Sequence, residues 1–266
     1  MLTSVFSKNL YDMRGGLIWW SVGLIAINFL IILIFPSIEQ SSAALTEYMD
    51  NLPPAMVAIF GNIQEIATME GYLGLELFGF FLPALTLGFG IAYGGGVVGS
   101  EEERGTLDLL LSYPISRRSV LTQKFGAIAV FALVVLVTST FGLLLGIALV
   151  DATIDVGNLA GAVLNTGLLT LFFGTLTLAL TGVGLNRGAA SGIAAGLAAV
   201  TFLMNGLAPL AELPDVVRHI TPWYYYDASE VLLTGFVPAN AAVLVVAIVF
   251  LLLIGLLGFQ RRDIAV

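Results

Sequence analysis

The 266-residue chain is 58% hydrophobic and only 11% charged, and its mean hydropathy is +1.00. In a soluble domain about a quarter of all residues are usually charged. This composition therefore excludes a soluble globular domain and indicates a polytopic membrane protein. The formal net charge of -8 does not favour a nucleic-acid partner, because neutralising phosphates takes clustered Lys and Arg. Cys is absent, which excludes disulfides and thiolate metal sites, and we expect no metal site.

The first 16 residues have the pattern of an amphipathic helix, with apolar side chains such as Val5, Leu10 and Met13 on one face. We predict that residues 1–16 form an interfacial helix, and an extension of the first span is the alternative. The apolar run 17–35, closed by Pro36, is as long as a bilayer core requires. It is too long for a removable signal peptide and lacks the cleavage site, so we expect it to stay as an anchor.

Six apolar runs of this kind predict an all-α fold with six transmembrane helices in a single domain, residues 1–266. The predicted spans are 17–35, 77–98, 125–150, 159–185, 189–210 and 239–259. Segments 37–76 and 211–238 are predicted to lie on the outer side of the membrane, and segment 100–124 on the inner side.

Basic residues set the predicted orientation, because cytoplasmic loops carry an excess of Lys and Arg. Only Arg218 falls in a predicted outer segment. The predicted inner segments hold the other nine of the ten basic residues: Lys8, Arg14, Arg104, Arg117, Arg118, Lys124, Arg187, Arg261 and Arg262. We therefore predict a multi-pass protein of the cell membrane with both termini in the cytoplasm.

The longest strongly charged run is SEEERGTLDLLLSYPISRRSVLTQK, residues 100–124. Ser100 can cap a helix whose first turn is the run 101–103, where three Glu carboxylates would meet the positive end of the helix dipole. Leucines at helical spacing follow until Pro114, so the pattern predicts one short amphipathic helix over 101–111. Ser116 can cap the next helix.

This run resembles the E-x-E-x-GTL-x-LLL-x-x-P-[VI]-[ST]-R signature of ABC-2 type transporter permeases, the membrane subunits of one class of ATP-driven transporter. The matching residues are Glu101, Glu103, Gly105, Thr106, Leu107, Leu109, Leu110, Leu111, Pro114, Ile115, Ser116 and Arg117. The run lies between the second and third predicted spans, where the family carries it. The resemblance implies a permease, expected to act as an exporter that uses ATP hydrolysed by a separate subunit.

The resemblance also implies a site at which the ATPase moves the permease through a short cytoplasmic coupling helix. The expected coupling residues are Glu101, Glu102, Glu103, Arg104, Gly105, Thr106, Leu107, Asp108, Leu110 and Leu111, with Leu107, Leu110 and Leu111 filling a groove on the ATPase. We expect a second cytoplasmic contact at Arg187. The implied partners are an ABC ATP-binding subunit, a second permease subunit in a homodimer or heterodimer, and membrane lipid.

No nucleotide site is expected in the chain itself. The P-loop pattern G-x-x-x-x-G-K-[ST] does not occur, and the only lysines are Lys8 and Lys124. Gly94 to Gly99 formally matches G-x-G-x-x-G but lacks the surrounding βαβ unit, so we interpret these glycines as packing residues. The chain is therefore expected not to be an enzyme and to hold no cofactor, with ATP and Mg bound by the partner subunit.

A stripe of threonines and a stripe of glycines each allow two interpretations. Thr166, Thr170, Thr177 and Thr181 form a narrow stripe on the fourth span, which either lines a translocation path or is satisfied by hydrogen bonds within and between helices. Gly188, Gly192 and Gly196 make a small-xxx-small surface for close helix contact. The resemblance favours a dimer contact there, and packing within the chain is the alternative.

An aromatic cluster, Trp223 to Tyr226, suits the headgroup level and predicts an outer interfacial belt, with contact to substrate or lipid as the alternative. Asp227 and Glu230 predict the start of a short helix, and Gly235 its end.

Three other functions compete with the permease reading. A membrane-embedded enzyme needs titratable groups at depth, yet no predicted span centre contains His, Asp, Glu, Lys or Arg, and neither H-E-x-x-H nor G-x-S-x-G occurs. The same lack of intramembrane carboxylates disfavours a proton-driven secondary transporter. A non-transporting membrane scaffold is the third alternative.

Overall fold

The computed structural model describes residues 4–49, 68–208 and 215–262. Within these ranges the chain is helical, contains no strand, and has six helices long and apolar enough to cross a membrane. They are α1 (Val5–Met49), the continuous segment formed by α3 (Met69–Tyr72), η2 (Leu73–Phe81) and α4 (Leu82–Glu103), then α6 (Arg117–Leu149), α7 (Val156–Gly182), α8 (Arg187–Leu207) and α12 (Pro238–Arg261). The predicted all-α fold with six spans is confirmed.

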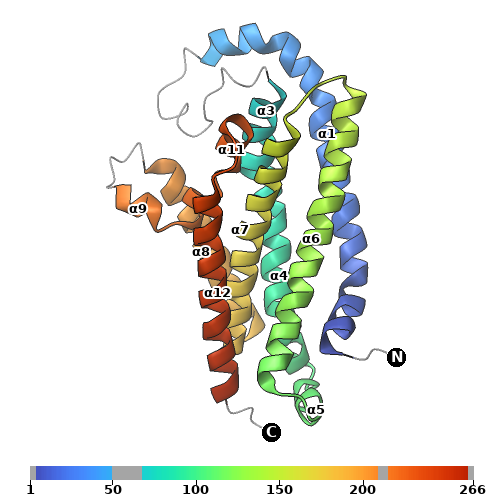
Figure 1. Ribbon diagram of the computed structural model, residues 1–266, viewed down its shortest axis with the longest axis vertical. Coiled ribbons are helices and arrows are strands. Elements are labelled where there is room, and N and C mark those ends of the chain that lie inside the picture. Colours follow the sequence, from blue (N-terminus) through green and yellow to red (C-terminus); the bar gives the residue numbers. More distant parts are fainter. Residues whose placement is uncertain (1–3, 50–67, 209–214, 263–266) are drawn as a thin grey trace.

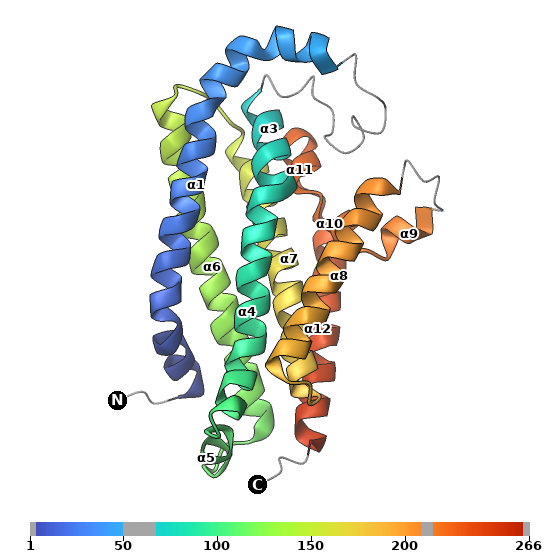
Figure 2. The ribbon, with the colours of Figure 1, turned by 180° about the vertical axis from the view of Figure 1, so that it is seen from behind.

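The long helices run roughly side by side, and α7 packs against α4, α6, α8 and α12 (Figures 1 and 2). Four short helices complete the described fold: α5 (Leu107–Leu111), α9 (Asp215–His219), α10 (Pro222–Tyr226) and α11 (Ala228–Thr234). One end of the bundle is formed by the start of α1, the end of α4, α5, the start of α6, the α7–α8 turn and the end of α12. These elements carry nine of the ten basic residues, all except Arg218, so we call this the basic end.

The first helix differs from the prediction of an interfacial helix followed by a span that ends at residue 35. α1 is one continuous helix of 45 residues that contains Pro36, and it bends over the far end of the bundle (Figure 1). An interior proline removes one backbone hydrogen bond and kinks a helix without having to end it. Val5 and Met13, placed by the prediction on a membrane-facing surface, are buried in the core of the chain. Of the predicted outer segment 37–76, residues 50–67 lie outside the described residues.

A π-helix, η2, directly precedes the turn of α4 that contains Pro83. Across η2 the hydrogen bonds run from residue i to i−5, and the N–H of Leu82 donates to the carbonyl of Leu77. Continuing that register would require an N–H at residue 83 for the carbonyl of Phe78, and proline has none. The hydroxyl of Tyr226 donates to the Phe78 carbonyl instead, at 2.7 Å.

The aromatic cluster therefore contributes to the core as well as to the surface, in contrast to the predicted interfacial belt. Tyr226 and Trp223 are buried, and the indole N–H of Trp223 donates to the carbonyl of Ala198 at 3.1 Å. A buried Tyr or Trp needs a partner for its polar atom, and here both partners are backbone carbonyls of spanning helices. The predicted end of α11 at Gly235 is confirmed, with a φ of 104° at that residue.

α4 and α7 approach so closely that their contact requires glycine. A Cβ added at Gly94 would lie 2.9 Å from the carbonyl carbon of Gly174, and one at Gly90 would lie 2.7 Å from the carbonyl oxygen of Thr170. Real Cβ atoms do not approach backbone atoms this closely, so either helix would have to shift. These glycines are packing residues, as predicted.

We expect Gly94→Ala to destabilise the protein strongly and Gly88→Ala, in the same helix, to leave it intact. A Cβ at Gly88 meets no atom within 4 Å. Overpacking at Gly94 should instead lower the free energy of unfolding by about 3 kcal/mol. Thermal unfolding of the purified variants in detergent measures the difference. Equal unfolding midpoints for the two variants would show that α4 and α7 can move apart without loss of stability.

Candidate functional site at the end of α4

The charged run 100–124 does not form the single helix predicted over 101–111. α4 continues through Glu103, the chain turns at Arg104 and Gly105, and α5 begins at Leu107. Gly105 has a φ of 65°, in the left-handed region where glycine carries no steric penalty. Ser100 therefore caps nothing, and the acidic residues occupy the last turn of a helix, where the dipole disfavours negative charge. Ser116 does cap α6, accepting a hydrogen bond from the N–H of Ser119 as predicted.

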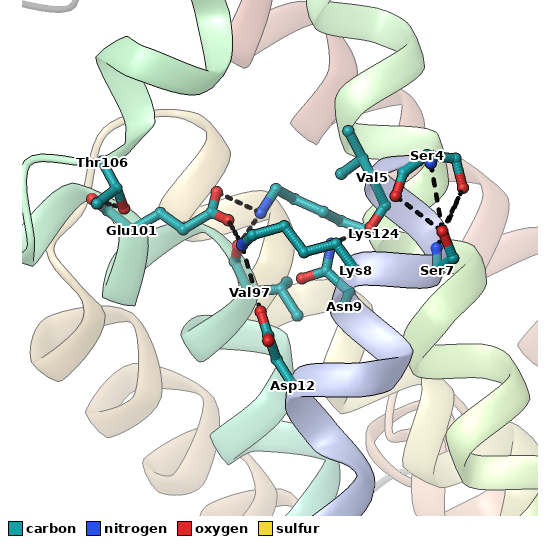
Figure 3. A network of polar contacts seen from close by, with 10 residues as sticks. All are labelled: Ser4, Val5, Ser7, Lys8, Asn9, Asp12, Val97, Glu101, Thr106 and Lys124. Atoms are coloured by element: carbon teal, nitrogen blue, oxygen red, sulfur yellow. Dashed lines mark hydrogen bonds and ion pairs between the residues drawn. The ribbon is translucent and has the colours of Figure 1, made fainter. Parts of the chain in front are cut away.

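Ion pairs explain why the acidic turn is stable at this position. Oε2 of Glu101 lies 2.7 Å from Nζ of Lys124, and Oε1 lies 2.9 Å from Nζ of Lys8 (Figure 3). The Lys124 side chain is 0% exposed and its Nζ also donates to the backbone carbonyl of Val97. Lys8 is shared with Asp12, at 3.2 Å. Glu101 thus joins α4 to α1 and α6.

The neighbouring residues of the same turn join α4 to two more helices. The guanidinium of Arg262, which directly follows α12, binds both carboxylate oxygens of Glu102 and donates to the carbonyl of Thr181. Arg187, the first residue of α8, donates to Oγ of Ser100 at 3.3 Å. Four basic side chains from four helices therefore meet one helical turn. We call Ser100, Glu101 and Glu102 with these four side chains the polar clamp.

The polar clamp was not predicted, since Lys8, Lys124 and Arg262 entered the sequence analysis only as charges that orient the chain. One signal was available. Lys124 lies between Leu121 and Ala127 on the apolar face of its helix, and a lysine on a buried face requires an acidic partner. The nearest acidic residues in the sequence are Asp108 and then those of the run 101–103.

α5 presents a different surface from the one predicted. Leu107 is 2% exposed, and Leu110 and Leu111 pack against the core, so the apolar face of α5 is turned toward its own chain. Leu107 is therefore not available to a partner in this structure. The exposed apolar side chains are Leu109, 66% exposed, and Tyr113, 65% exposed. Glu103, Arg104, Gly105, Thr106 and Asp108 are exposed beside them.

The threonine stripe on α7 is buried, and every hydroxyl donates to a backbone carbonyl of α7 itself. Thr166 donates to Ala162, Thr170 to Thr166, Thr177 to Phe173 and Thr181 to Thr177. Local hydrogen bonds thus account for all four side chains within one chain, and a role in lining a path stays a prediction.

The glycine surface on α8 faces outward. Gly188, Gly192 and Gly196 are exposed, and a Cβ added at Gly192 or Gly196 would meet no atom within 4 Å. These glycines therefore make no close helix contact within the chain. Arg187, the predicted second contact, is half-buried against α4, whereas its neighbours Asn186 and Gly188 are exposed.

The fold and the site define a polytopic membrane protein whose described residues form six helices long enough to cross a membrane, with a charged end held together by the polar clamp. The family model described as ABC-2 family transporter protein matches residues 3–264, nearly the whole chain. The chain therefore belongs to the ABC-2 transporter family, whose members are membrane components of transporters rather than catalysts themselves. No curated protein matches the sequence.

We expect Glu101→Gln to destabilise the protein by about 3 to 5 kcal/mol, because it leaves the charge of Lys124 buried without a carboxylate. Glu103→Gln removes the same charge from an exposed position two residues away and serves as the control. Denaturant or thermal unfolding in detergent compares the two. When Lys124→Met is already present, Glu101→Gln should lower the free energy of unfolding by less than it does in the native sequence. An equal loss in both would contradict a stabilising ion pair between Glu101 and Lys124.

Proposed function

We propose that the chain is the membrane-spanning permease subunit of an ABC-2 type exporter in the cytoplasmic membrane, and that a separate ATP-binding subunit hydrolyses the ATP. Members of the family generally work with such a subunit. The observation that carries the proposal is α5, a short helix that projects from the basic end with Asp108 and Leu109 exposed and with the exposed Tyr113 just after it.

The covalent and polar connections of α5 suit it to transmit motion. A three-residue turn joins it to α4, and five residues join it to α6, whose first turn is capped by Ser116. The carbonyl of Glu101 accepts hydrogen bonds from both the N–H and the hydroxyl of Thr106, at 2.8 and 3.1 Å. A displacement of α5 would therefore reach Glu101, and through the polar clamp the ends of α1, α6, α8 and α12.

The second proposed partner is another permease subunit. α8 exposes Ile193, Leu197 and Val200 as well as its glycines, so much of its surface is free for contact within the bilayer. Small and apolar residues permit close packing of helices in lipid. Family members often dimerise, and α8 is the helix that we propose for that contact.

A proton-driven secondary transporter is less well supported by the arrangement of charges. Among the described residues the fully buried charged side chain is Lys124, and it lies near the start of α6 rather than midway along that span. Proton relays use titratable side chains within the membrane interior.

The proposed orientation places the basic end in the cytoplasm and can be tested directly, because the chain has no native cysteine. We expect Thr153→Cys, in the exposed α6–α7 turn, to react with a membrane-impermeant maleimide in intact cells. Ser112→Cys, exposed after α5 at the basic end, should react only after permeabilisation. The reverse pattern would overturn the orientation and the proposed ATPase contact with it.

We expect a photocrosslinking amino acid at position 109 to capture a P-loop ATPase in native membranes, identified by mass spectrometry. The same probe at position 107 should react within the chain, because Leu107 is buried. Leu109→Ser should reduce copurification of the ATPase about tenfold, as expected for the loss of a buried apolar contact of roughly 1.5 kcal/mol.

Val156→Ser is the matched control, because Val156 is 60% exposed at the opposite end of the bundle. Capture of lipid or water alone at position 109, or an equal loss in both serine variants, would argue against the α5 contact.

A further inference from the structure

A polar cavity of about 810 Å³ opens at the basic end between α1, α4 and the start of α8. Charged side chains line it from all three helices: Lys8 and Asp12 from α1, Glu101 and Arg104 from the end of α4, and Arg187 from α8. Ser100, Thr106 and Tyr93 add hydroxyls, and Trp20, Met13 and Ala92 form an apolar part of the wall. The cavity is thus polar toward the basic end and apolar deeper in the bundle.

The charges around this cavity do not balance. The two carboxylates, Asp12 and Glu101, are matched by Lys8 and by Lys124 behind the wall. Neither Arg104 nor Arg187 forms an ion pair within the described residues. Two guanidinium groups at one cavity therefore have positive charge that no carboxylate of the described chain neutralises.

Arg187 is held in place before any ligand arrives. Its side chain crosses the glycine face of α4, where a Cβ at Gly99 would lie 2.7 Å from the Cβ of Arg187 and one at Gly96 would lie 3.9 Å from Nη2. The hydrogen bond to Ser100 fixes the guanidinium. A pre-positioned planar guanidinium suits the oxygens of a phosphate, which it can bind through two parallel N–H groups.

An apolar groove of about 330 Å³ lies farther from the basic end, and Gly88 in its wall is one turn of α4 away from Ala92 in the wall of the cavity. It runs between α4 and α8 and is lined by Ala84, Leu87, Gly88, Ile91, Ala195 and Ala199, among others. Gly88 in the groove and Gly96 in the cavity are eight residues apart on α4, which corresponds to about 12 Å along a helix. The groove and the cavity share α4 and α8, and α1 forms the remaining wall of the cavity. A polar cavity close to an apolar groove fits the two parts of an amphiphile.

We propose that the cavity and the groove together bind an anionic phospholipid of the surrounding bilayer. Its phosphate lies against Arg187 and Arg104, and an acyl chain follows the groove between α4 and α8. Basic pockets at the ends of transmembrane helices attract anionic headgroups, and burial of the chain adds affinity for each methylene. This binding site does not depend on the proposed transport function, because it requires neither the ATPase nor a transported substrate.

The test uses native mass spectrometry of the purified full-length protein in detergent, titrated with phosphatidylglycerol or with phosphatidylcholine of the same acyl chains. We expect the anionic lipid to bind at least about tenfold more tightly, the effect of one or two charge-assisted hydrogen bonds. Arg187→Gln combined with Arg104→Gln should remove this preference. Arg118→Gln, which changes an exposed basic residue outside the cavity at the same end, should leave it unchanged.

Two glycine variants test the position of the lipid without changing charge. Gly96→Leu should fill the headgroup cavity and Gly88→Leu the groove, and both should weaken phosphatidylglycerol binding. Leucine has the higher helix propensity, and a Cβ fits at both positions, so both variants should fold. Circular dichroism and size-exclusion chromatography confirm that each variant is folded before titration.

Three results would overturn the proposal. They are equal affinity for the two lipids, an equal loss of preference in Arg118→Gln and in the double variant, and a change of oligomeric state without loss of lipid in Gly88→Leu. The last result would assign the groove to a second copy of the chain.

Discussion

The ion pair between Lys124 and Glu101 is the interaction on which the arrangement of the bundle depends. A lysine that is 0% exposed cannot keep its charge unless an acidic group lies within a few ångströms, and the structure supplies one at 2.7 Å. The start of α6 must therefore remain beside the end of α4. Because Glu101 has a second carboxylate oxygen, it also holds Lys8 and with it the start of α1.

The rest of the bundle is held by contacts of another kind. Between α4 and α7 the helices meet through glycine, and the hydroxyls of α7 are satisfied within their own helix. Such surfaces allow close packing but few directional contacts between helices. Most polar contacts between the spanning helices lie at the basic end, and a few lie elsewhere, such as those from Tyr72 to the Ile31 carbonyl and from Asn28 to Ser139. A force applied at the basic end thus acts where the helices are most specifically connected.

Composition and apolar run length were sufficient to predict six spanning helices, because a bilayer requires long apolar segments in any arrangement. They could not predict that α1 continues through Pro36 or that η2 adopts π-helical hydrogen bonding before Pro83, since run length and composition carry no information on helix register. The acidic run was misplaced for a related reason. The helix dipole favours carboxylates in a first turn by about 1 kcal/mol at most on a surface. Ion pairs with Lys124, Lys8 and Arg262 outweigh that preference, and the partners of a carboxylate come from helices distant in sequence.

The spacing of the two glutamates in the E-x-E pattern explains how one short run serves both the interior and the surface. Successive residues of an α-helix are about 100° apart, so positions two apart lie on nearly opposite faces. Glu101 faces α1 and α6 and is 13% exposed, whereas Glu103 is exposed beside α5. Glu102 lies between them and binds Arg262. A single turn therefore connects the spanning helices on one side and leaves the charge of Glu103 exposed on the other. Any rotation of this turn changes both sets of contacts at once, which gives the permease a physical basis for linking a surface contact to the positions of its helices.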